Sequence, residues 1–455
     1  MGPGVLKAAV VPAAFALPRG APRRAAIASV LAAMAAAVLD ASSVNMALPS
    51  IAEALQVRPS IAAWLVIAYQ GALAASLLPL AAMGERFGHR RTFVVGTALF
   101  GFCAAASGLA SGFATLVAFR ALQGVGAAAI MALGVALLRQ TVAEDELGKA
   151  IGWNAMTVAL MSAAGPAIGA VLLGLGSWRF VFLGSGALAA AALMASRSLP
   201  SRGSERRALD PVGLLLYLSI APAFVVAVGL ARVWASLSGL LVAWGVAGLL
   251  LLLQRDLRRA SPFLPLALLR APDLRRSVLA SVACFTAISV ALLMLPFALH
   301  GRLGLSPPEV AAMMTPWPLA VLLTTPVTAR LLDHLLPRRL CSIGGILLAC
   351  GLVLLAIGSR IAGVSVHVIG VILCGVGFGL FQTPNNRTMF LAAPIDRAAS
   401  VGGVQGTARL TGQVTGALIA SILLSATTIG TGTSLAFGIA AVAAIASAAV
   451  SGMNR

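Results

Sequence analysis

Fourteen stretches of mostly apolar residues, each long enough to cross a lipid bilayer as a helix, divide this 455-residue sequence. A spanning helix needs about 20 such residues, and in lipid only helices and closed barrels satisfy their backbone hydrogen bonds. The runs are unbroken, which excludes the alternating pattern of a barrel. We therefore expect an all-α polytopic membrane protein. The expected spans are 25–48, 61–83, 92–112, 114–138, 148–173, 179–196, 211–231, 235–253, 277–299, 308–332, 341–359, 364–386, 398–424 and 429–451.

The 32 Lys and Arg residues follow the alternation of these spans. If both termini are cytoplasmic, 25 of them fall on the cytoplasmic side, five fall in outside loops, and Arg120 and Arg409 fall within spans. Cytoplasmic loops of membrane proteins carry such an excess of positive charge. We therefore expect both termini in the cytoplasm and the chain in the inner (plasma) membrane. This pattern explains the net charge of +19 and excludes nucleic acid as a partner.

Residues 1–24 precede the first span. A signal peptide is conceivable there, because a short apolar run follows Lys7. Arg19, Arg23 and Arg24 directly precede the span and would anchor it on the inside, which favours a cytoplasmic tail.

Two loops in equivalent positions resemble each other, which indicates an internal repeat. The loop after the second span reads MGERFGHRRTF (83–93), and the loop after the tenth reads ARLLDHLLPRRL (329–340). Parallel repeats of this kind are typical of transporters. We expect a six-helix bundle over 25–196, an inserted helix pair with basic flanks over 197–276, and a second six-helix bundle over 277–455.

Asp40 is the one acidic residue that we place inside the membrane. A charge at the centre of a spanning helix costs roughly 2.5–3.5 kcal/mol, so such residues usually serve ion, proton or substrate movement. Arg120, in the fourth span, is the natural partner, because a cation lowers a carboxylate's pKa and burial raises it. The alternatives are an Asp40 hydrogen-bonded to Ser43 or a neighbouring helix without titrating, and an Arg120 bonded to backbone carbonyls. The sequence leaves open whether Asp40 and Arg120 meet.

A charged loop joins the second and third spans. Its glycines allow a tight turn, and its glutamate is placed to pair with an arginine or to lie at a helix N-terminus. Such a latch would break when two halves of the protein rock apart. The alternative is a basic loop that only fixes topology. The residues are Gly84, Glu85, Arg86, Gly88, Arg90 and Arg91.

The fifth span contains Gly165, Pro166 and Gly169, which combine a helix kink with a small-residue packing face. The alternative is an ordinary transmembrane proline. In the thirteenth span, Gln405 and Gln413 lie one turn on either side of Arg409 and form a polar stripe. These side chains either line a cavity or satisfy one another between helices.

The full set of cavity candidates consists of polar side chains within spans. They are Asn45, Gln70, Gln123, Asn154, Gln405, Arg409 and Gln413.

Several features of enzymes are missing from the sequence. The one Gly-Lys pair, Gly148-Lys149, is followed by Ala150 and lacks the upstream glycine of a P-loop. The four histidines lie far apart, and the five cysteines lack metal-ligand spacing. We expect no enzyme activity, no cofactor and no metal.

Taken together, the motifs resemble those of the major facilitator superfamily, in particular its fourteen-helix drug:proton antiporter branch. LDASSVNMALP (39–49) resembles the first-helix signature of that branch, GERFGHRR (84–91) the superfamily loop, FRALQGVGAA (119–128) the fourth-helix motif, and GPAIGAVL (165–172) the antiporter motif. GLFQTPNNRTM and GTARLTGQVTGA resemble late-helix segments. The family usually has Asp where Glu85 stands and Gly where Met161 and Ala170 stand.

The resemblance implies two bundles that rock about a midplane cavity, with Arg120 facing that cavity and taking part in proton movement. We expect a proton-coupled exporter of hydrophobic or amphipathic small molecules, acting as a monomer. A facilitator or proton symporter for a metabolite is the second hypothesis. A non-transporting membrane enzyme or sensor is the third, although no catalytic cluster or soluble domain supports it.

Overall fold

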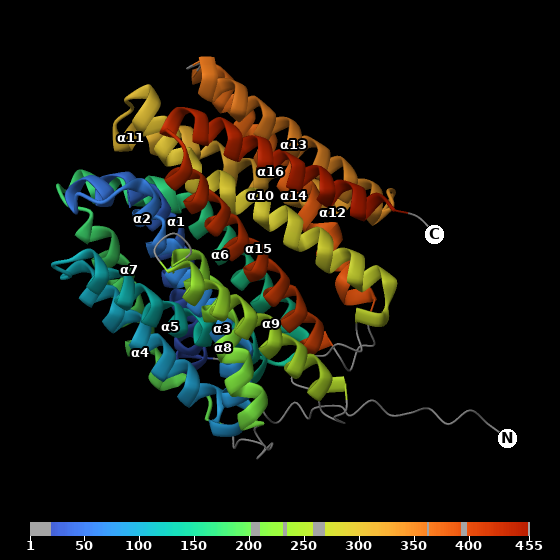
Figure 1. Cartoon of the computed structure of the whole chain (residues 1–455). Helices are drawn as coiled ribbons and strands as arrows, with labels where there is room; N and C mark the ends of the chain where they lie inside the picture. The colour runs from blue at the N-terminus through green and yellow to red at the C-terminus, as the bar shows by residue number, and fades with distance from the viewer. Residues whose placement is uncertain are drawn as a thin grey trace.

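The fold is known from a computed structural model that describes residues 20–201, 210–230, 234–257, 269–361, 364–392 and 398–453. These residues form a bundle of long α-helices (Figure 1). Thirteen helices of the described part are long and apolar enough to cross a membrane, and the apolar helix α8 (Pro211–Leu230) accompanies them. The expected all-α polytopic fold is therefore confirmed.

The helices fall into a first half, an intervening pair and a second half. The first half contains α1 (Ala21–Ala54), α2 (Pro59–Ala62), α3 (Trp64–Phe87), α4 (His89–Gly108), α5 (Phe113–Thr141), α6 (Glu144–Gly174) and α7 (Arg179–Ala195). The pair is α8 and α9 (Ala235–Leu257). The second half contains α10 (Pro272–Leu303), α11 (Pro307–Met314), α12 (Pro316–Leu331), α13 (Pro337–Ile361), α14 (Val364–Leu391), α15 (Ala398–Ala426) and α16 (Ile429–Gly452).

Some helix ends differ from the expected ones. Helix α1 begins at Ala21, so the last residues of the expected tail are helical, whereas residues 1–19 lie outside the described part. Helix α10 begins at Pro272, within the expected basic flank. The tenth span is two helices that meet at Thr315, because Pro316 lacks an N–H and its ring crowds the preceding turn.

Glycines hold the helices of each half together at backbone distance, and they do so in the same way twice. A Cβ at Gly124 would clash with the Tyr69 carbonyl of α3. A Cβ at Gly375 would clash with the Trp317 carbonyl of α12 in the same way. Lipid gives helices no hydrophobic reason to associate, so close packing at small residues takes that role.

A second glycine, two residues further along each of these helices, repeats the correspondence. A Cβ at Gly126 would lie 2.6 Å from the Phe100 amide nitrogen of α4, and one at Gly377 would clash with the Leu348 amide nitrogen of α13. Helices α3, α4 and α5 thus correspond to α12, α13 and α14. The internal repeat suggested by the two loops extends into the packing.

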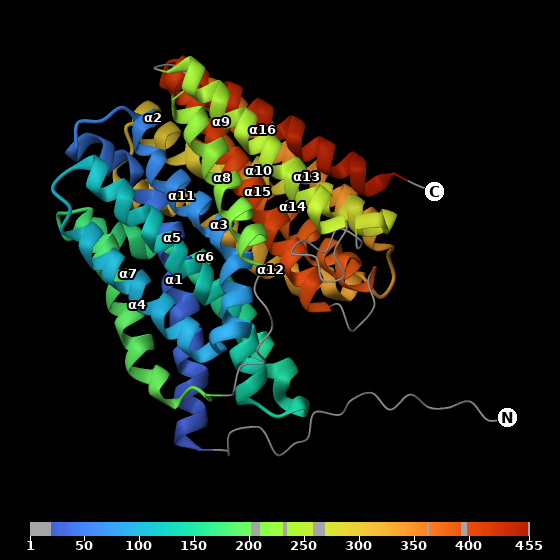
Figure 2. The same ribbon diagram turned by 60° about the horizontal axis from the view of Figure 1, so that its bottom comes forward.

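The two halves meet along α3 and α15 and along α6 and α11 (Figures 1 and 2). Polar bridges also join them at one end of the bundle. We call the end where α1 begins and α16 ends the terminal end, and the other the opposite end. At the opposite end, His300 Nε2 lies 2.9 Å from Glu53 Oε1, and the Ser421 hydroxyl donates to the Ser60 carbonyl. Helix α8 packs on α3, where the Tyr217 hydroxyl donates to the Ala74 carbonyl.

The glycine contacts predict that adding a methyl group will destabilise the protein at a packed glycine and not at an unpacked one. We expect Gly126→Ala to lower the free energy of unfolding by about 1–3 kcal/mol, because the methyl group meets backbone that has no room to move. Gly438→Ala is the control, since a Cβ there meets nothing within 4 Å. Thermal unfolding in detergent measures both variants, and equal stability of the two would contradict the packing role.

Candidate functional site

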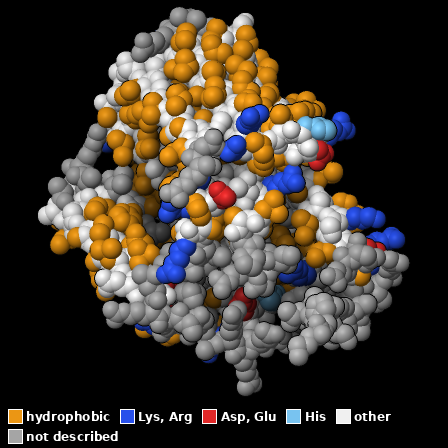
Figure 3. All heavy atoms as spheres, turned by 90° about the vertical axis from the view of Figure 1, so that its right-hand side faces the viewer, with side chains coloured by type: hydrophobic (Ala, Val, Ile, Leu, Met, Phe, Trp, Pro, Cys, Tyr) orange, Lys and Arg blue, Asp and Glu red, His pale blue; other side chains and the backbone are white. Residues whose placement is uncertain are grey.

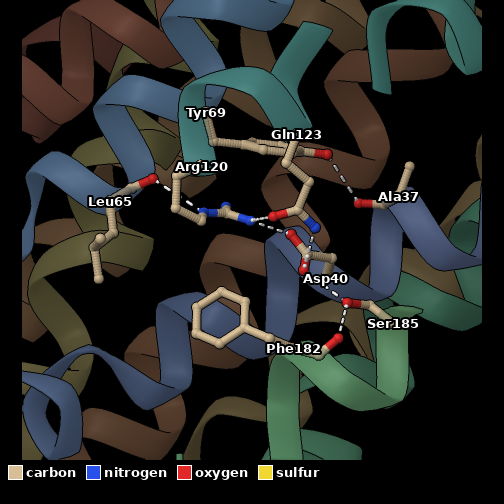
Figure 4. Close-up of polar contacts among 8 residues, drawn as sticks. All are labelled: Ala37, Asp40, Leu65, Tyr69, Arg120, Gln123, Phe182 and Ser185. Atoms are coloured by element: carbon tan, nitrogen blue, oxygen red, sulfur yellow. Dashed lines mark hydrogen bonds and ion pairs between the residues drawn. The ribbon is translucent and has the colours of Figure 1, made fainter. Parts of the chain in front are cut away.

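Asp40 and Arg120 form an ion pair inside the first half. The Arg120 Nη1 atom donates to Asp40 Oδ2 at 2.5 Å, and the two side chains are 1% and 0% exposed. Asp40 comes from the middle of α1 and Arg120 from α5, 80 positions away in the sequence. Figure 4 shows both side chains pointing toward each other between the helices. The structure thus answers the question that the sequence left open.

Two further side chains donate hydrogen bonds to the Asp40 carboxylate. Gln123 Nε2 donates to Asp40 Oδ1 at 3.0 Å, and the Ser185 hydroxyl of α7 donates to the same oxygen at 2.9 Å. Asp40 thus accepts hydrogen bonds from Arg120, Gln123 and Ser185, which come from two other helices. Ser43, the partner considered from the sequence, instead donates to the Gly165 carbonyl at 3.0 Å.

The guanidinium of Arg120 is enclosed by polar and aromatic groups. Its Nη1 also donates to Gln123 Oε1 at 2.7 Å, and its Nε donates to the Leu65 carbonyl at 3.3 Å. The ring of Tyr69 lies 4.2 Å and that of Phe182 5.7 Å from the guanidinium carbon. Cation–π contacts of this kind stabilise a desolvated cation.

Sequence reasoning missed several members of this network. Tyr69 was detectable, because it is one of only two tyrosines in the chain and lies next to Gln70 in an apolar span. Ser185 carried no signal, since many serines occur in these spans. Leu65 contributes only a carbonyl, which no side-chain pattern reveals.

The network lies closer to the opposite end of the bundle than to the terminal end. Arg120 is the eighth residue of α5, which starts at the opposite end, so it lies about 10 Å along the helix. Helices α1, α3, α5 and α7 enclose it completely. The family resemblance implied that Arg120 faces a central cavity; in this conformation the side chain instead points into the interior of the first half.

The second half repeats the scaffold without the charges. On α6, the Cβ positions of Gly165 and Gly169 face Ser42 and Ser43 of α1, and on α15 those of Gly412 and Gly416 face Phe285 and Thr286 of α10. The glycine pairs of α5 and α14 share one register, which sets Arg120 opposite Val371 and Gln123 opposite Cys374. The fold is thus built once with the ion pair and once without it.

The charged loop is shorter than expected, because Gly84 is helical. Helix α3 continues to Phe87, and a Cβ at Gly84 would clash with Leu133 of α5, so this glycine serves packing and not the turn. Gly88 makes the turn alone, with a φ of 96° that favours glycine. Arg90 Nη2 donates to the Arg197 carbonyl at 3.2 Å. Glu85 and Arg91 are exposed, and the Arg86 guanidinium lies 5.6 Å from the centroid of the Phe87 ring.

The glycines of the fifth-span motif pack α6 against α1. A Cβ at Gly165 would clash with Ser42, and one at Gly169 would lie 3.2 Å from Ser43. Helix α6 continues without interruption through Pro166. The motif therefore places α6 directly behind the segment of α1 that carries Asp40.

The cavity candidates divide into three groups. Gln123 belongs to the ion-pair network and is fully buried in this conformation. Asn45 Oδ1, Gln70 Oε1, Asn154 Oδ1 and Arg409 Nε are buried without a hydrogen-bond partner. Gln405 and Gln413 are half-buried on α15, and the Gln413 backbone carbonyl accepts from Ser289 at 2.7 Å.

A cavity of about 260 Å³ lies elsewhere, at the terminal end of the second half. Residues of α10, α13, α14 and α16 line it, among them Asp273, Arg276 and Arg338, and no cavity candidate does. In the described part of the chain, no group of three or more His, Cys, Asp or Glu residues could hold a metal ion.

Solved structures show what class of protein this fold defines. The chain resembles a peptide transporter of the POT family solved with sulfate, with a TM-score of 0.73, 16% identity and 96% coverage of both chains. It also resembles the xylose transporter XylE of E. coli, with a TM-score of 0.67 and 13% identity over 94% of this chain and 96% of that one. The chain therefore shares the fold of these multi-pass helical membrane proteins.

The family follows from the sequence comparison. Residues 30–417 match the model of the Major Facilitator Superfamily, and the chain belongs to this family. It is 35% identical to the uncharacterized transporter YebQ of Escherichia coli over 95% of both chains. It is 29% identical to the multidrug resistance protein Stp of Mycobacterium tuberculosis over 86% of this chain and 74% of the relative, and 26% identical to the riboflavin transporter RibZ of Clostridioides difficile over 82% and 81%.

The ion pair predicts that substitutions of Asp40 and Arg120 have non-additive effects on the free energy of unfolding. Asp40→Ala leaves the buried Arg120 guanidinium without its carboxylate partner and should lower the free energy of unfolding by about 3–5 kcal/mol. Adding Arg120→Met to the same chain should recover part of that loss, because no uncompensated charge remains. A double-mutant cycle of unfolding free energies in mixed micelles measures the coupling, and additive losses would show that the two groups act independently.

Proposed function

We propose that this transporter exports hydrophobic or amphipathic small molecules in exchange for protons, with Asp40 as the proton-binding group. One observation carries the proposal: the buried ion pair occurs in one of two otherwise repeated halves. The second half packs its helices with Val371 and Cys374 at the positions of Arg120 and Gln123. Since a buried pair is a costly element that folding does not require there, we infer that it is retained for transport.

The geometry supports a simple coupling step. With Arg120, Gln123 and Ser185 donating to it, Asp40 is held ionised. If these donors move away while the site stays dry, burial favours the neutral form and the carboxylate takes up a proton. Protonation in turn removes the attraction between α1 and α5. A change in helix arrangement and a change in proton occupancy are thereby linked in both directions.

The other elements are assigned roles consistent with this cycle. We infer that α1 and the Gly165–Pro166–Gly169 segment of α6 move together, because their backbones are in close contact. The charged loop at Gly88 is proposed as a contact that forms and breaks at the terminal end. Figure 3 shows Lys and Arg side chains spread over the face at that end, which supports cytoplasmic termini in an inner membrane. We propose a monomeric unit.

The relatives support export but also name an alternative. Stp is a multidrug resistance protein, whereas RibZ is a riboflavin transporter. A facilitator or proton symporter for a metabolite is therefore the second candidate. It differs in one measurable respect, since a facilitator's transport continues when the pH gradient is collapsed and a symporter's accumulation runs in the direction of proton flow.

Replacing Asp40 tests the coupling. We expect Asp40→Asn to lower pH-gradient-driven uptake of ethidium or rhodamine 6G into inside-out vesicles by at least about tenfold, because the side chain no longer binds a proton. Exchange of labelled for unlabelled dye without a gradient should persist. Asp273→Asn, at an exposed carboxylate of α10, is the control. Unchanged gradient-driven uptake in Asp40→Asn would remove Asp40 from the coupling mechanism.

The bridge between Glu53 and His300 predicts how the opposite end opens. Both His300 ring nitrogens face oxygen acceptors, Glu53 Oε1 at 2.9 Å and the Leu305 carbonyl at 2.8 Å, so the charged ring is the form that satisfies both. Glu53→Gln removes the ion pair and should raise the open population by up to about fivefold, the effect of a partly exposed pair.

Labelling of a cysteine placed at Ser60 with an impermeant maleimide measures that opening, because Ser60 is buried at the junction of the halves. Glu309→Gln is the matched control, since its carboxylate bonds Ser306 within the second half. Equal labelling in the two variants would show that the bridge does not hold this end closed.

A further inference from the structure

We propose that Arg409 is the recognition point for an acidic group on the transported molecule, so that amphipathic anions are among the substrates. This rests on the proposed transport function and deepens it. The argument uses the direction in which Arg409 points, the groups that it contacts and those that it lacks.

Helix phase places Arg409 at the interface between the halves. Gly412 and Gly416 pack against α10 of the same half, whereas Cβ positions at Gly403 and Gly406 meet α3 of the first half. With 3.6 residues per turn, Arg409 projects between these two faces. Arg409 is the twelfth residue of α15, which begins at the terminal end, so it lies about 17 Å along the helix, close to the middle of a bilayer.

The contacts of Arg409 confirm this direction. Its Nη2 reaches across the interface to the Met131 sulfur of α5 at 3.7 Å. Leu410, the next residue, belongs to the apolar cluster of the first half. Tyr69 of α3 lies within electrostatic range of Arg409 and also contacts Arg120. The guanidinium thus faces the first half beside the ion-pair network.

A carboxylate partner is missing in the described part of the chain. No Asp or Glu described there forms an ion pair with Arg409, its Nε is buried without a hydrogen-bond partner, and a thioether sulfur is only a weak acceptor. Arg120, by contrast, has a carboxylate, an amide and a carbonyl. A permanently charged, half-buried group at this depth of the membrane favours an anionic partner, and a cargo that carries one satisfies it.

The surroundings of Arg409 favour an amphipathic anion as the ligand and not a small inorganic anion. The Met131 sulfur offers a polarisable apolar contact next to the guanidinium. Arginine binds a carboxylate through two parallel N–H donors. The ligand class is therefore an aromatic or aliphatic body with one carboxylate or similar acidic group.

A matched pair of dyes tests the proposal. 5-Carboxyfluorescein and rhodamine 6G share a xanthene ring system but carry opposite charges. Inside-out vesicles with wild-type protein should accumulate both when a pH gradient is imposed. We expect Arg409→Gln to lower the initial rate for carboxyfluorescein by about tenfold to a hundredfold, the loss expected for one charge-assisted hydrogen-bond site. Arg409→Lys should recover part of it.

Rhodamine 6G transport reports on folding, because it should be unchanged or faster in Arg409→Gln. Arg387→Gln is the control for net charge, since this arginine is exposed and donates to the Leu332 carbonyl at 3.5 Å. An equal effect of Arg409→Gln on both dyes overturns the proposal, as does wild-type transport of rhodamine 6G alone. In the latter case Asp40-dependent export of the cation still stands, so the two proposals fail separately.

Discussion

Close backbone contact at glycine is the interaction on which this structure depends. Helices in lipid gain little from burying apolar side chains against each other, so they associate where small residues let backbones approach. Gly124 and Gly126 bring α5 against α3 and α4, and Gly375 and Gly377 bring α14 against α12 and α13. The same three-helix arrangement thus occurs twice, and everything else is placed on it.

On that scaffold the two halves take different roles. The first half encloses a carboxylate and a guanidinium that no water reaches in this conformation, with Gln123 bridging them and Ser185 donating to the carboxylate. The second half has Val371 and Cys374 at the positions that match Arg120 and Gln123. A protein that needs only to fold would have no use for the difference, because a buried ion pair is often no more stable than well-packed apolar residues. This asymmetry is the reason that we propose a proton-binding group in the first half.

The interface between the halves carries the remaining unusual charge. Arg120 is satisfied within its own half, whereas Arg409 extends from the second half toward Met131 of the first. Tyr69 stands between the two arginines, stacked on one and near the other. A molecule held at the interface would consequently lie beside the group that we propose exchanges the proton. The coupling of cargo and proton then needs no long path through the protein.

The sequence by itself determined the helical membrane fold, the repeat and the identity of the two charges, because apolar length, basic loops and ionisable residues in lipid are local properties. It did not determine that Asp40 and Arg120 touch, that Ser185 and the Leu65 carbonyl complete their network, or that Gly84 packs a helix instead of making a turn. Those facts depend on which helix faces lie together across 80 or more residues of chain. Only the tertiary structure decided them, since helix rotation and neighbour choice are set by the summed packing of many small contacts.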